Sequence, residues 1–194
     1  VGGFGVAHDV ITLVRAAKIL HQEHNFGYRF VIVGNGVKRA DCEKEARKKG
    51  LNNVEFRDSV QKADVPKVQM ESDILIACVL DSDAYRFGLN LNKIFDYFAS
   101  GRPVIFSGNA PNDPVRESGC GYSIPPENPE AMADALKKYI ELTPDQRIAM
   151  GRRGREWVEK NFNMEMLGER METLLKQAVE EKKKKKKCLL KNGN

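Results

Sequence analysis

Short apolar runs alternate along this chain with longer stretches in which apolar residues recur every three or four positions. Asp9, a residue type that caps helix N-termini, opens the first such stretch, and the apolar residues of 10–20 fall on one helical face. An apolar run at 28–33 ends at a glycine, which is typical of a strand that meets a turn. The same patterns predict further strands over 53–56, 74–79, 103–106 and 121–124, and helices over 38–49, 92–100, 130–142 and 163–181, with two more that begin at Asp64 and Thr143.

The alternation of strand and helix, repeated about six times, predicts an α/β fold with a doubly wound, parallel, six-stranded sheet. In such Rossmann-like sheets, ligands bind at the carboxyl ends of the strands. The residues expected there, most of them glycine or polar, are Gly2, Gly3, Phe4, Gly5, His8, Gly34, Asn35, Gly36, Arg57, Asp58, Ser107 and Gly108. We expect residues 1–162 to form this domain, residues 163–181 a C-terminal helix, and residues 182–194 a disordered polybasic tail.

Length and charge narrow the class of protein. A chain of 194 residues suits one domain with a tail. The formal net charge is +5, but Lys182–Lys187 is a run of six lysines, so the remainder of the chain carries −1. A near-neutral body argues against a nucleic-acid-binding fold, which spreads basic residues over a face or a helix. The longest apolar run, Ile74–Leu80, is far shorter than the ~20 residues of a membrane-spanning helix.

The six lysines have three interpretations. Blocks of like charge are most often solvated and disordered. A basic cluster also attracts anionic lipid, at about 1 kcal/mol per lysine near the surface. The third interpretation is that the lysines continue the preceding helix. Of these, lipid contact would give the chain an anionic membrane surface as a partner.

The cysteines argue against two kinds of structural site. Cys42, Cys78, Cys120 and Cys188 include no CxxC pair and have no nearby histidine that would complete a metal centre. Dispersed cysteines fit a reducing compartment rather than a secreted disulfide scaffold. We therefore expect a cytoplasmic protein without a metal site.

The turn 34–36, Gly-Asn-Gly, follows a strand and has three interpretations. A nicotinamide dinucleotide site needs a third small residue three positions after the second glycine, and Arg39 stands there instead. A lone GxG is otherwise a tight strand-to-helix turn, or a place where a nucleotide approaches the backbone. These alternatives stay open at the level of sequence.

The segment 86–103 carries more chemistry. A long loop, 80–91, leads to a predicted helix that begins near Asn92, and helix N-termini bind phosphate through their free N–H groups. Lys93 would add a positive charge beside a diphosphate, and Asp96, one turn further on, would accept hydrogen bonds from ribose hydroxyls. The alternative is a surface Lys–Asp pair on a helix whose apolar residues belong to the core.

The string Asn-Lys-Ile-Phe-Asp-Tyr at 92–97, followed by Ala99, Gly101 and Pro103, resembles the donor-site helix of family 4 glycosyltransferases with the GT-B fold. The resemblance is closest to the branch that assembles bacterial capsule and O-antigen polysaccharides. Further strings follow in the order of that family: VIVGNG, NVEF, SDILIA, GRPVIFSG, GCGYSIPPENPEAMADAL and MGRRGREWVEKNF. Together they cover about residues 1–175.

The resemblance implies that this domain binds a nucleotide-sugar, best matched by a UDP-sugar, for retaining transfer of a hexosyl or N-acetylhexosaminyl group without a metal ion. The ribose-binding carboxylate of the family matches Asp96 by its distance from the glycine after the helix. By the same resemblance, the turns 2–5 and 107–109 would approach the phosphates and the sugar. Arg57 and Asp58 would face the base.

Three departures from the family pattern concern the diphosphate and the catalytic group. Gly3 and His8 stand where many members have an Arg and a Lys that bind the diphosphate. Arg86 and Lys93 are the candidates to supply that charge instead. The family's pair of glutamates eight residues apart is absent, because Gly88 takes the place of the first. The group beside the anomeric carbon is therefore unassigned.

GT-B enzymes place their active site between two such domains, so the resemblance implies the donor-binding half of an enzyme, inactive without its acceptor-binding domain. Residues 163–181 would pack against that domain, and the enzyme would lie in the cytoplasm or at the inner membrane. Two other function classes stay open. One is a nonenzymatic nucleotide-binding or interaction module. The other is a UDP-sugar epimerase-like domain. Such a domain needs several acid–base groups at its site, and this chain has only His8 near the expected one.

Overall fold

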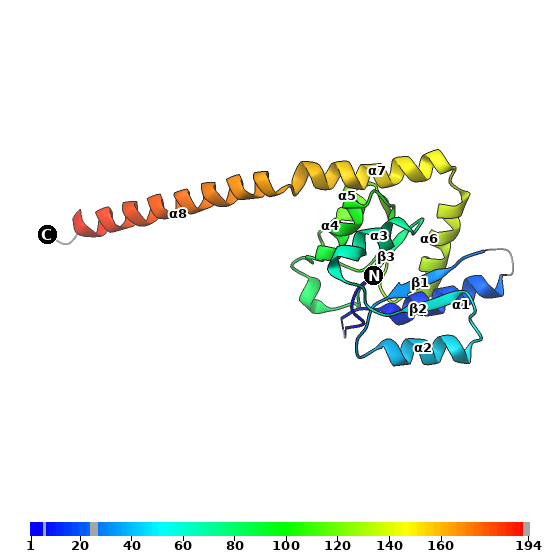
Figure 1. The fold of residues 1–194 in the computed structure, drawn as a ribbon. Helices are drawn as coiled ribbons and strands as arrows, with labels where there is room; N and C mark the ends of the chain where they lie inside the picture. Colours follow the sequence, from blue (N-terminus) through cyan, green and yellow to red (C-terminus); the bar gives the residue numbers. More distant parts are fainter. Residues whose placement is uncertain (6, 24–26, 192–194) are drawn as a thin grey trace. The chain divides into compact units, whose positions relative to one another are not determined.

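Parallel strands and helices alternate through most of the chain, as the sequence predicts (Figure 1). The structure is a computed structural model that describes residues 1–5, 7–23 and 27–191, with side chains as far as residue 183. Its α-helices and strands are α1 (Val10–Gln22), β1 (Phe30–Val33), α2 (Arg39–Lys48), β2 (Val54–Arg57), α3 (Val65–Met70), β3 (Leu75–Cys78), α4 (Asn92–Ala99), β4 (Val104–Ser107), α5 (Pro114–Ser118), β5 (Gly121–Ile124), α6 (Pro129–Glu141), α7 (Pro144–Asn161) and α8 (Met164–Lys191). Two short 3-10 turns, η1 (Lys62–Asp64) and η2 (Asp83–Tyr85), precede α3 and α4.

The predicted single sheet of six strands is not what the structure contains. Its five described strands form two parallel sheets, β1 with β2 and β3 with β4 and β5. The register pairs Phe30 with Val54 in the first sheet and Leu75 with Val104 in the second. The reason for the division is that β1 and β3 do not pair with each other, and a cavity lies between them.

The core joins α1 and α6 to the strands. Val14 and Leu20 of α1 are buried with Met132 and Leu136 of α6, in one cluster that also contains Ile32 of β1. Apolar residues at a spacing of three and four on each helix produce this contact. The sequence prediction of a helix capped by Asp9 is confirmed, since its carboxylate accepts a hydrogen bond from the N–H of Thr12.

Helix α7 packs on the other elements through glycines. A Cβ on Gly151 would stand 2.0 Å from the carbonyl oxygen of Gly101, and one on Gly154 would stand 2.9 Å from Cβ of Cys120. The rings of Phe98 and Trp157 meet edge to face, with centroids 5.7 Å apart. Backbone contact of this closeness leaves no room for a side chain.

The chain divides into two compact units, Val1–Trp157 and Val158–Asn194. The first unit holds every strand described above. The second holds α8, whose backbone is helical as far as Lys191 and so includes the six lysines. The side chains of Lys184–Lys187 and Cys188 lie outside the described residues. Within the described part of the chain, no helix has the length and apolar character needed to cross a membrane.

Candidate functional site

The glycine turn after β1 is shaped by the chain's own first residues. The N–H of Gly2 donates to the carbonyl of Val33 (2.9 Å), and the N–H of Phe4 donates to that of Asn35 (2.9 Å). Gly34 has a φ of +145°, and a Cβ there would stand 1.8 Å from the carbonyl oxygen of Gly2. A Cβ on Gly36 would likewise stand 2.7 Å from the carbonyl oxygen of Phe4. Close backbone packing of residues 2–4 therefore accounts for the GxG pattern.

Lys93 lies beside this turn, in the first turn of α4. Its Nζ would be 3.0 Å from a Cβ on Gly2. Burial lowers the pKa of the Lys93 ammonium. Among the described residues, no carboxylate forms an ion pair with it. A partly buried charge without a counter-charge is costly, so this ammonium favours an anion beside Gly2.

His8 lies in the same region, at the start of α1. Its Nδ1 is buried and has no hydrogen-bond partner, and a Cβ on Gly5 would stand 3.2 Å from it. Burial, and then the positive charge of Lys93, lower the pKa of His8 below its ordinary value of 6.5. The imidazole is therefore mainly neutral at pH 7, and its Nδ1 is a buried polar atom without a partner among the residues that the structure describes.

Arg39 joins the turns that follow β1 and β2. Its Nε bonds to the carboxylate of Glu43 at 2.7 Å. Its Nη1 lies 2.8 to 3.3 Å from four oxygens, which belong to the Gly34 carbonyl, the Asn35 side chain, the Arg57 carbonyl and the Asp58 carboxylate. The residue that breaks the dinucleotide pattern thus holds two predicted binding segments together. The planar fork of a guanidinium suits such a task better than an ammonium does.

The predicted base-facing pair is occupied by protein contacts. The Arg57 guanidinium pairs with Glu55 at 2.7 Å, and the Asp58 carboxylate pairs with Arg39 at 2.8 Å. Asp58 is 85% exposed, so its second oxygen stays accessible to solvent or ligand. Arg57 also lines the cavity described below.

One asparagine bonds to both backbone groups of Leu89 in the loop between β3 and α4. The side chain of Asn112 accepts from the N–H of Leu89 and donates to the carbonyl of Leu89, both at 2.7 Å. Gly88, with a φ of +123°, makes the sharp bend beside it. Arg86 stacks on the ring of Phe87, 4.4 Å from its centroid, and Phe87 is 84% exposed. The guanidinium of Arg86 therefore lies over an exposed ring.

The remaining predicted residues differ in their surroundings. Asp96 and Asn92 are exposed on α4. Ser107 is buried, and its hydroxyl donates to the carbonyl of Pro125 at 3.3 Å. A Cβ on Gly108 would stand 2.5 Å from the ring of Phe106. The buried side chain of Ser107 and the absence of a Cβ at Gly108 thus allow close packing at the end of β4.

A cavity of about 570 Å³ brings some of the predicted residues together. Those that line it are Gly2, Gly3, Phe4, His8, Arg57 and Lys93. The predicted residues that do not line it are Gly5, Gly34, Asn35, Gly36, Asp58, Arg86, Gly88, Asn92, Asp96, Ser107 and Gly108. Its polar end therefore combines a glycine turn, a neutral imidazole and an ammonium, a set that suits a phosphate group.

Sequence reasoning missed three residues that shape this region. They are Arg39, Asn112 and Tyr97, whose buried hydroxyl donates to the carbonyl of Val1 at 3.1 Å. Arg39 had a usable signal, because a guanidinium three residues after a strand-end GxG is within reach of the neighbouring strand ends. Asn112 and Tyr97 act on residues 23 and 96 positions away, which no local pattern reveals. Among the described residues, no group of three His, Cys, Asp or Glu side chains is placed to hold a metal ion.

Known proteins are similar to this chain over the region that holds the candidate site. The family model for glycosyl transferases group 1 matches residues 1–141. No curated protein matches the sequence. A solved C-terminal domain of a glycosyl transferase group 1 family protein, LpcC from Francisella tularensis, is similar at a TM-score of 0.68 and 18% identity, over 84% of each chain.

Two longer solved proteins are similar to this chain in fold. HepE from Anabaena, in complex with UDP, has a TM-score of 0.76 and 14% identity, over 91% of this chain and 47% of its own. Sucrose-phosphate synthase from Thermosynechococcus elongatus has a TM-score of 0.73 and 21% identity, over 92% and 44%. The chain thus spans less than half the length of these two proteins. Because the family model matches residues 1–141 of its 194 residues, the chain belongs to the glycosyl transferases group 1 family.

Proposed function

We propose that this chain is the donor-binding half of a glycosyltransferase and that it binds a UDP-linked sugar. The observation that carries the proposal is the partly buried ammonium of Lys93 beside the backbone of Gly2, with no ion-pair partner among the described side chains. A nucleoside diphosphate would supply the missing negative charge. Membership of the glycosyl transferases group 1 family and the similarity to HepE, which was solved with UDP, support the same ligand class.

Each part of the donor has a proposed place. The diphosphate would lie by Lys93 and the Nδ1 of His8, and the ribose hydroxyls would bind the exposed carboxylate of Asp96. The free oxygen of Asp58 and the turn at Asn35 would face the base. Arg39 would act as a positioning residue, since it bonds to both of these segments.

The finer assignment concerns the reaction. We propose retaining transfer of a hexosyl or N-acetylhexosaminyl group in surface polysaccharide synthesis, without a metal ion. An acceptor-binding domain outside residues 1–194 would complete the active site, so this chain by itself would bind donor without transferring sugar. We place the enzyme in the cytoplasm, with the lysines of α8 facing anionic lipid of the inner membrane.

Calorimetric titration of the chain with UDP tests the proposal, with ADP and GDP as competitors of the same charge. Saturable UDP binding in the presence of EDTA is the expected result, and no heat at millimolar UDP would refute it. To test the ribose contact, Asp96→Asn is titrated with UDP and with 2′,3′-dideoxy-UDP. The variant should bind UDP more weakly and should bind the dideoxy analogue with unchanged affinity. Asp41→Asn, an exposed carboxylate on α2, is the matched control.

A nonenzymatic nucleotide-binding module would also bind UDP. The two functions separate when the chain is joined to an acceptor-binding domain of the same family, because transfer from a UDP-sugar then appears for the first and not for the second. An epimerase-like domain would instead change the configuration of the UDP-sugar with no acceptor present.

A further inference from the structure

The loop that joins β3 to α4, residues 80–91 and called the β3–α4 loop below, is folded on itself. Its middle contains the 3-10 turn η2. Directly after this turn, the N–H of Gly88 donates to the carbonyl of Tyr85 at 3.0 Å. Asp81 and Leu89 lie on either side of this bonded region. Contacts at these two residues therefore decide where the loop lies on the domain.

A side chain from another loop bonds to the backbone at each of these two residues. The carboxylate of Glu127 accepts from the N–H of Asp81 at 3.2 Å. The side-chain amide of Asn112 bonds to both backbone groups of Leu89 at 2.7 Å, and a Cβ on Gly88 would stand 3.1 Å from its Oδ1. An amide carries a donor and an acceptor, so it can bond to both backbone groups of one residue. The loop is thus bonded at both ends.

Asn112 and Glu127 occupy equivalent positions in two successive units of the fold, and we call them the anchoring residues. Each directly precedes the residue that caps a helix. Asp113 caps α5 and Asn128 caps α6, through side chains that accept from backbone N–H groups at 3.0 and 2.8 Å. A proline follows the cap in both helices and favours the backbone conformation of their first turn. The two caps therefore fix the backbone next to each anchoring residue.

The backbone of Glu127 argues for a role of its side chain. Its φ of +54° lies in the left-handed region, and among the described residues every other one with a positive φ is a glycine. Glycine adopts this conformation without strain, whereas a residue with a Cβ does so at a cost in free energy. Strained residues of this kind cluster at functional sites. A glutamate at this position therefore offers something that a glycine would not, and the bond to Asp81 is such a contribution.

The β3–α4 loop lies next to the candidate site. The segment 2–9 bonds to the end of β1 through Gly2 and to the loop through Ala7, whose carbonyl accepts from Leu80 at 3.2 Å. The turns proposed to face the base follow β1 and β2, whereas both anchoring residues follow β4 and β5, in the other sheet. A diphosphate beside His8, within this segment, would therefore have the base on one side and the loop on the other.

We propose that Asn112 and Glu127 are positioning residues, which hold the β3–α4 loop in the conformation that contacts the group attached to the diphosphate. They act through the backbone of the loop. The loop presents Arg86 stacked on the exposed ring of Phe87, which places hydrogen-bond donors beside an apolar ring. A sugar, with hydroxyl groups around C–H faces, matches both. The choice of ligand rests on the proposed function, whereas the two bonds to the loop do not.

Backbone amide relaxation, measured by NMR, tests whether the anchoring residues hold the loop. In the parent chain, we expect order parameters of about 0.85 at the amides of Asp81 and Leu89, the value of rigid backbone. Glu127→Ala should lower the first and Asn112→Ala the second, towards the value of about 0.6 that marks a flexible loop. Glu127→Gln keeps an acceptor oxygen and should leave both unchanged. Equal order parameters in the parent and the alanine variants would overturn the proposal.

Calorimetric titration with UDP, UDP-glucose and UDP-N-acetylglucosamine tests what the loop contacts. We expect both alanine variants to bind UDP as the parent does, and to bind the sugar-bearing ligands roughly three- to tenfold more weakly, as for one lost hydrogen bond. Glu127→Gly separates positioning from stability, because it removes the carboxylate and relieves the backbone strain. Its melting temperature should stay unchanged or rise while its affinity for the sugar-bearing ligands falls. A residue that only stabilises the fold would show the opposite pattern.

The matched controls are Glu130→Ala, an exposed carboxylate in the first turn of α6, and Asn52→Ala, an exposed amide in the turn before β2. Neither should change the order parameters or the affinities. Equal losses for UDP and for the sugar-bearing ligands in the anchoring variants would overturn the proposal and leave the proposed function intact. A parent chain that binds none of the three ligands would refute the proposed function and the choice of ligand, while the order parameters would still decide whether the two residues hold the loop.

Discussion

The ammonium nitrogen of Lys93 lies so close to Gly2 that a Cβ on this glycine would stand 3.0 Å from it. The contact joins the first turn of α4 to the first residues of the chain. No carboxylate among the described side chains pairs with this charge. The fold thus holds a positive charge at the point where parallel strands end, which is where α/β sheets bind their ligands.

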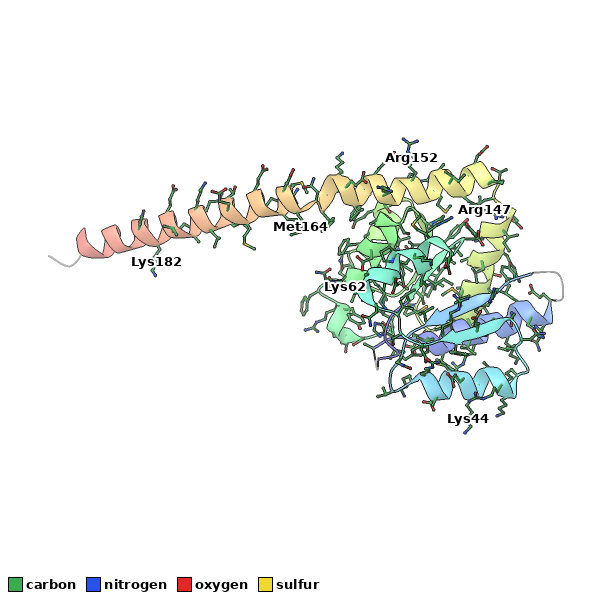
Figure 2. All side chains as sticks on the ribbon, viewed as in Figure 1. Lys44, Lys62, Arg147, Arg152, Met164 and Lys182 are labelled. Carbon is green, nitrogen blue, oxygen red and sulfur yellow. The ribbon has the colours of Figure 1, made fainter. Side chains whose placement is uncertain are left out.

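Replacing Lys93 by methionine removes the charge and keeps most of the apolar stem. Charge-assisted hydrogen bonds contribute about 1.5–3 kcal/mol, so we expect the Kd for UDP to rise roughly 10- to 100-fold. The melting temperature should stay unchanged or rise, because a partly buried, unpaired charge is lost. Lys44→Met is the control, since Figure 2 shows Lys44 on α2 directed away from the strands. Equal Kd values for the two variants, measured by calorimetry, would contradict the role of Lys93.

The Gly34→Ala variant tests the packing of the glycine turn. Its Cβ would overlap the carbonyl oxygen of Gly2 at 1.8 Å, in a backbone conformation with a φ of +145°. Gly50→Ala is matched to it, because Gly50 has a φ of +63° but open space around it. The left-handed conformation alone costs about 1–2 kcal/mol. Urea unfolding should therefore give a loss of about that size for Gly50→Ala and a clearly larger one for Gly34→Ala. Similar losses would show that the contact with Gly2 does not form.

The Arg39→Lys variant tests whether the planar guanidinium of Arg39 is needed or only its positive charge. Lysine keeps the positive charge but cannot reach Glu43 and the four oxygens around Nη1 at once. We expect weaker UDP binding, with a larger change for the uracil base than for the diphosphate, measured by comparing UDP with pyrophosphate. Arg47→Lys, which alters a more exposed partner of the same Glu43, should change neither. A parallel loss for both ligands would assign Arg39 a general role in folding instead.

His8 predicts a distinctive dependence on pH. Because burial lowers its pKa in the folded chain, the unfolded chain binds the proton more readily, and stability falls as pH drops through 6.5. The negative charge of a bound diphosphate instead favours the protonated form of His8. UDP should therefore bind more tightly as pH falls through the same range. The His8→Gln variant should reduce both trends, and the difference between variant and parent cancels the titration of UDP itself. Melting curves and calorimetry from pH 5 to 8 give the two slopes. If the variant keeps both slopes, His8 is not the titrating group.

The order of elements was predictable because it depends on local patterns. Asp9 caps α1, and Gly101, with a φ of +70°, follows the end of α4 where the sequence placed it. The role of Gly34 was not predictable, because the atom it avoids belongs to Gly2, which lies far away in sequence. Arg39 was recognised as an exception to a motif, but its contacts with two separate turns appear only in three dimensions.

Periodicity, charge and residue type are local properties, so the α/β alternation, the near-neutral body and the chemistry available at the strand ends could be predicted from the sequence alone. Which of those residues meet depends on the packing of the folded chain. It placed Lys93 and His8 at one cavity, engaged Asp58 and Ser107 in protein contacts, and left β1 and β3 apart. The physical reason is that hydrogen bonds, burial and electrostatic shifts depend on distances between segments that only packing brings together.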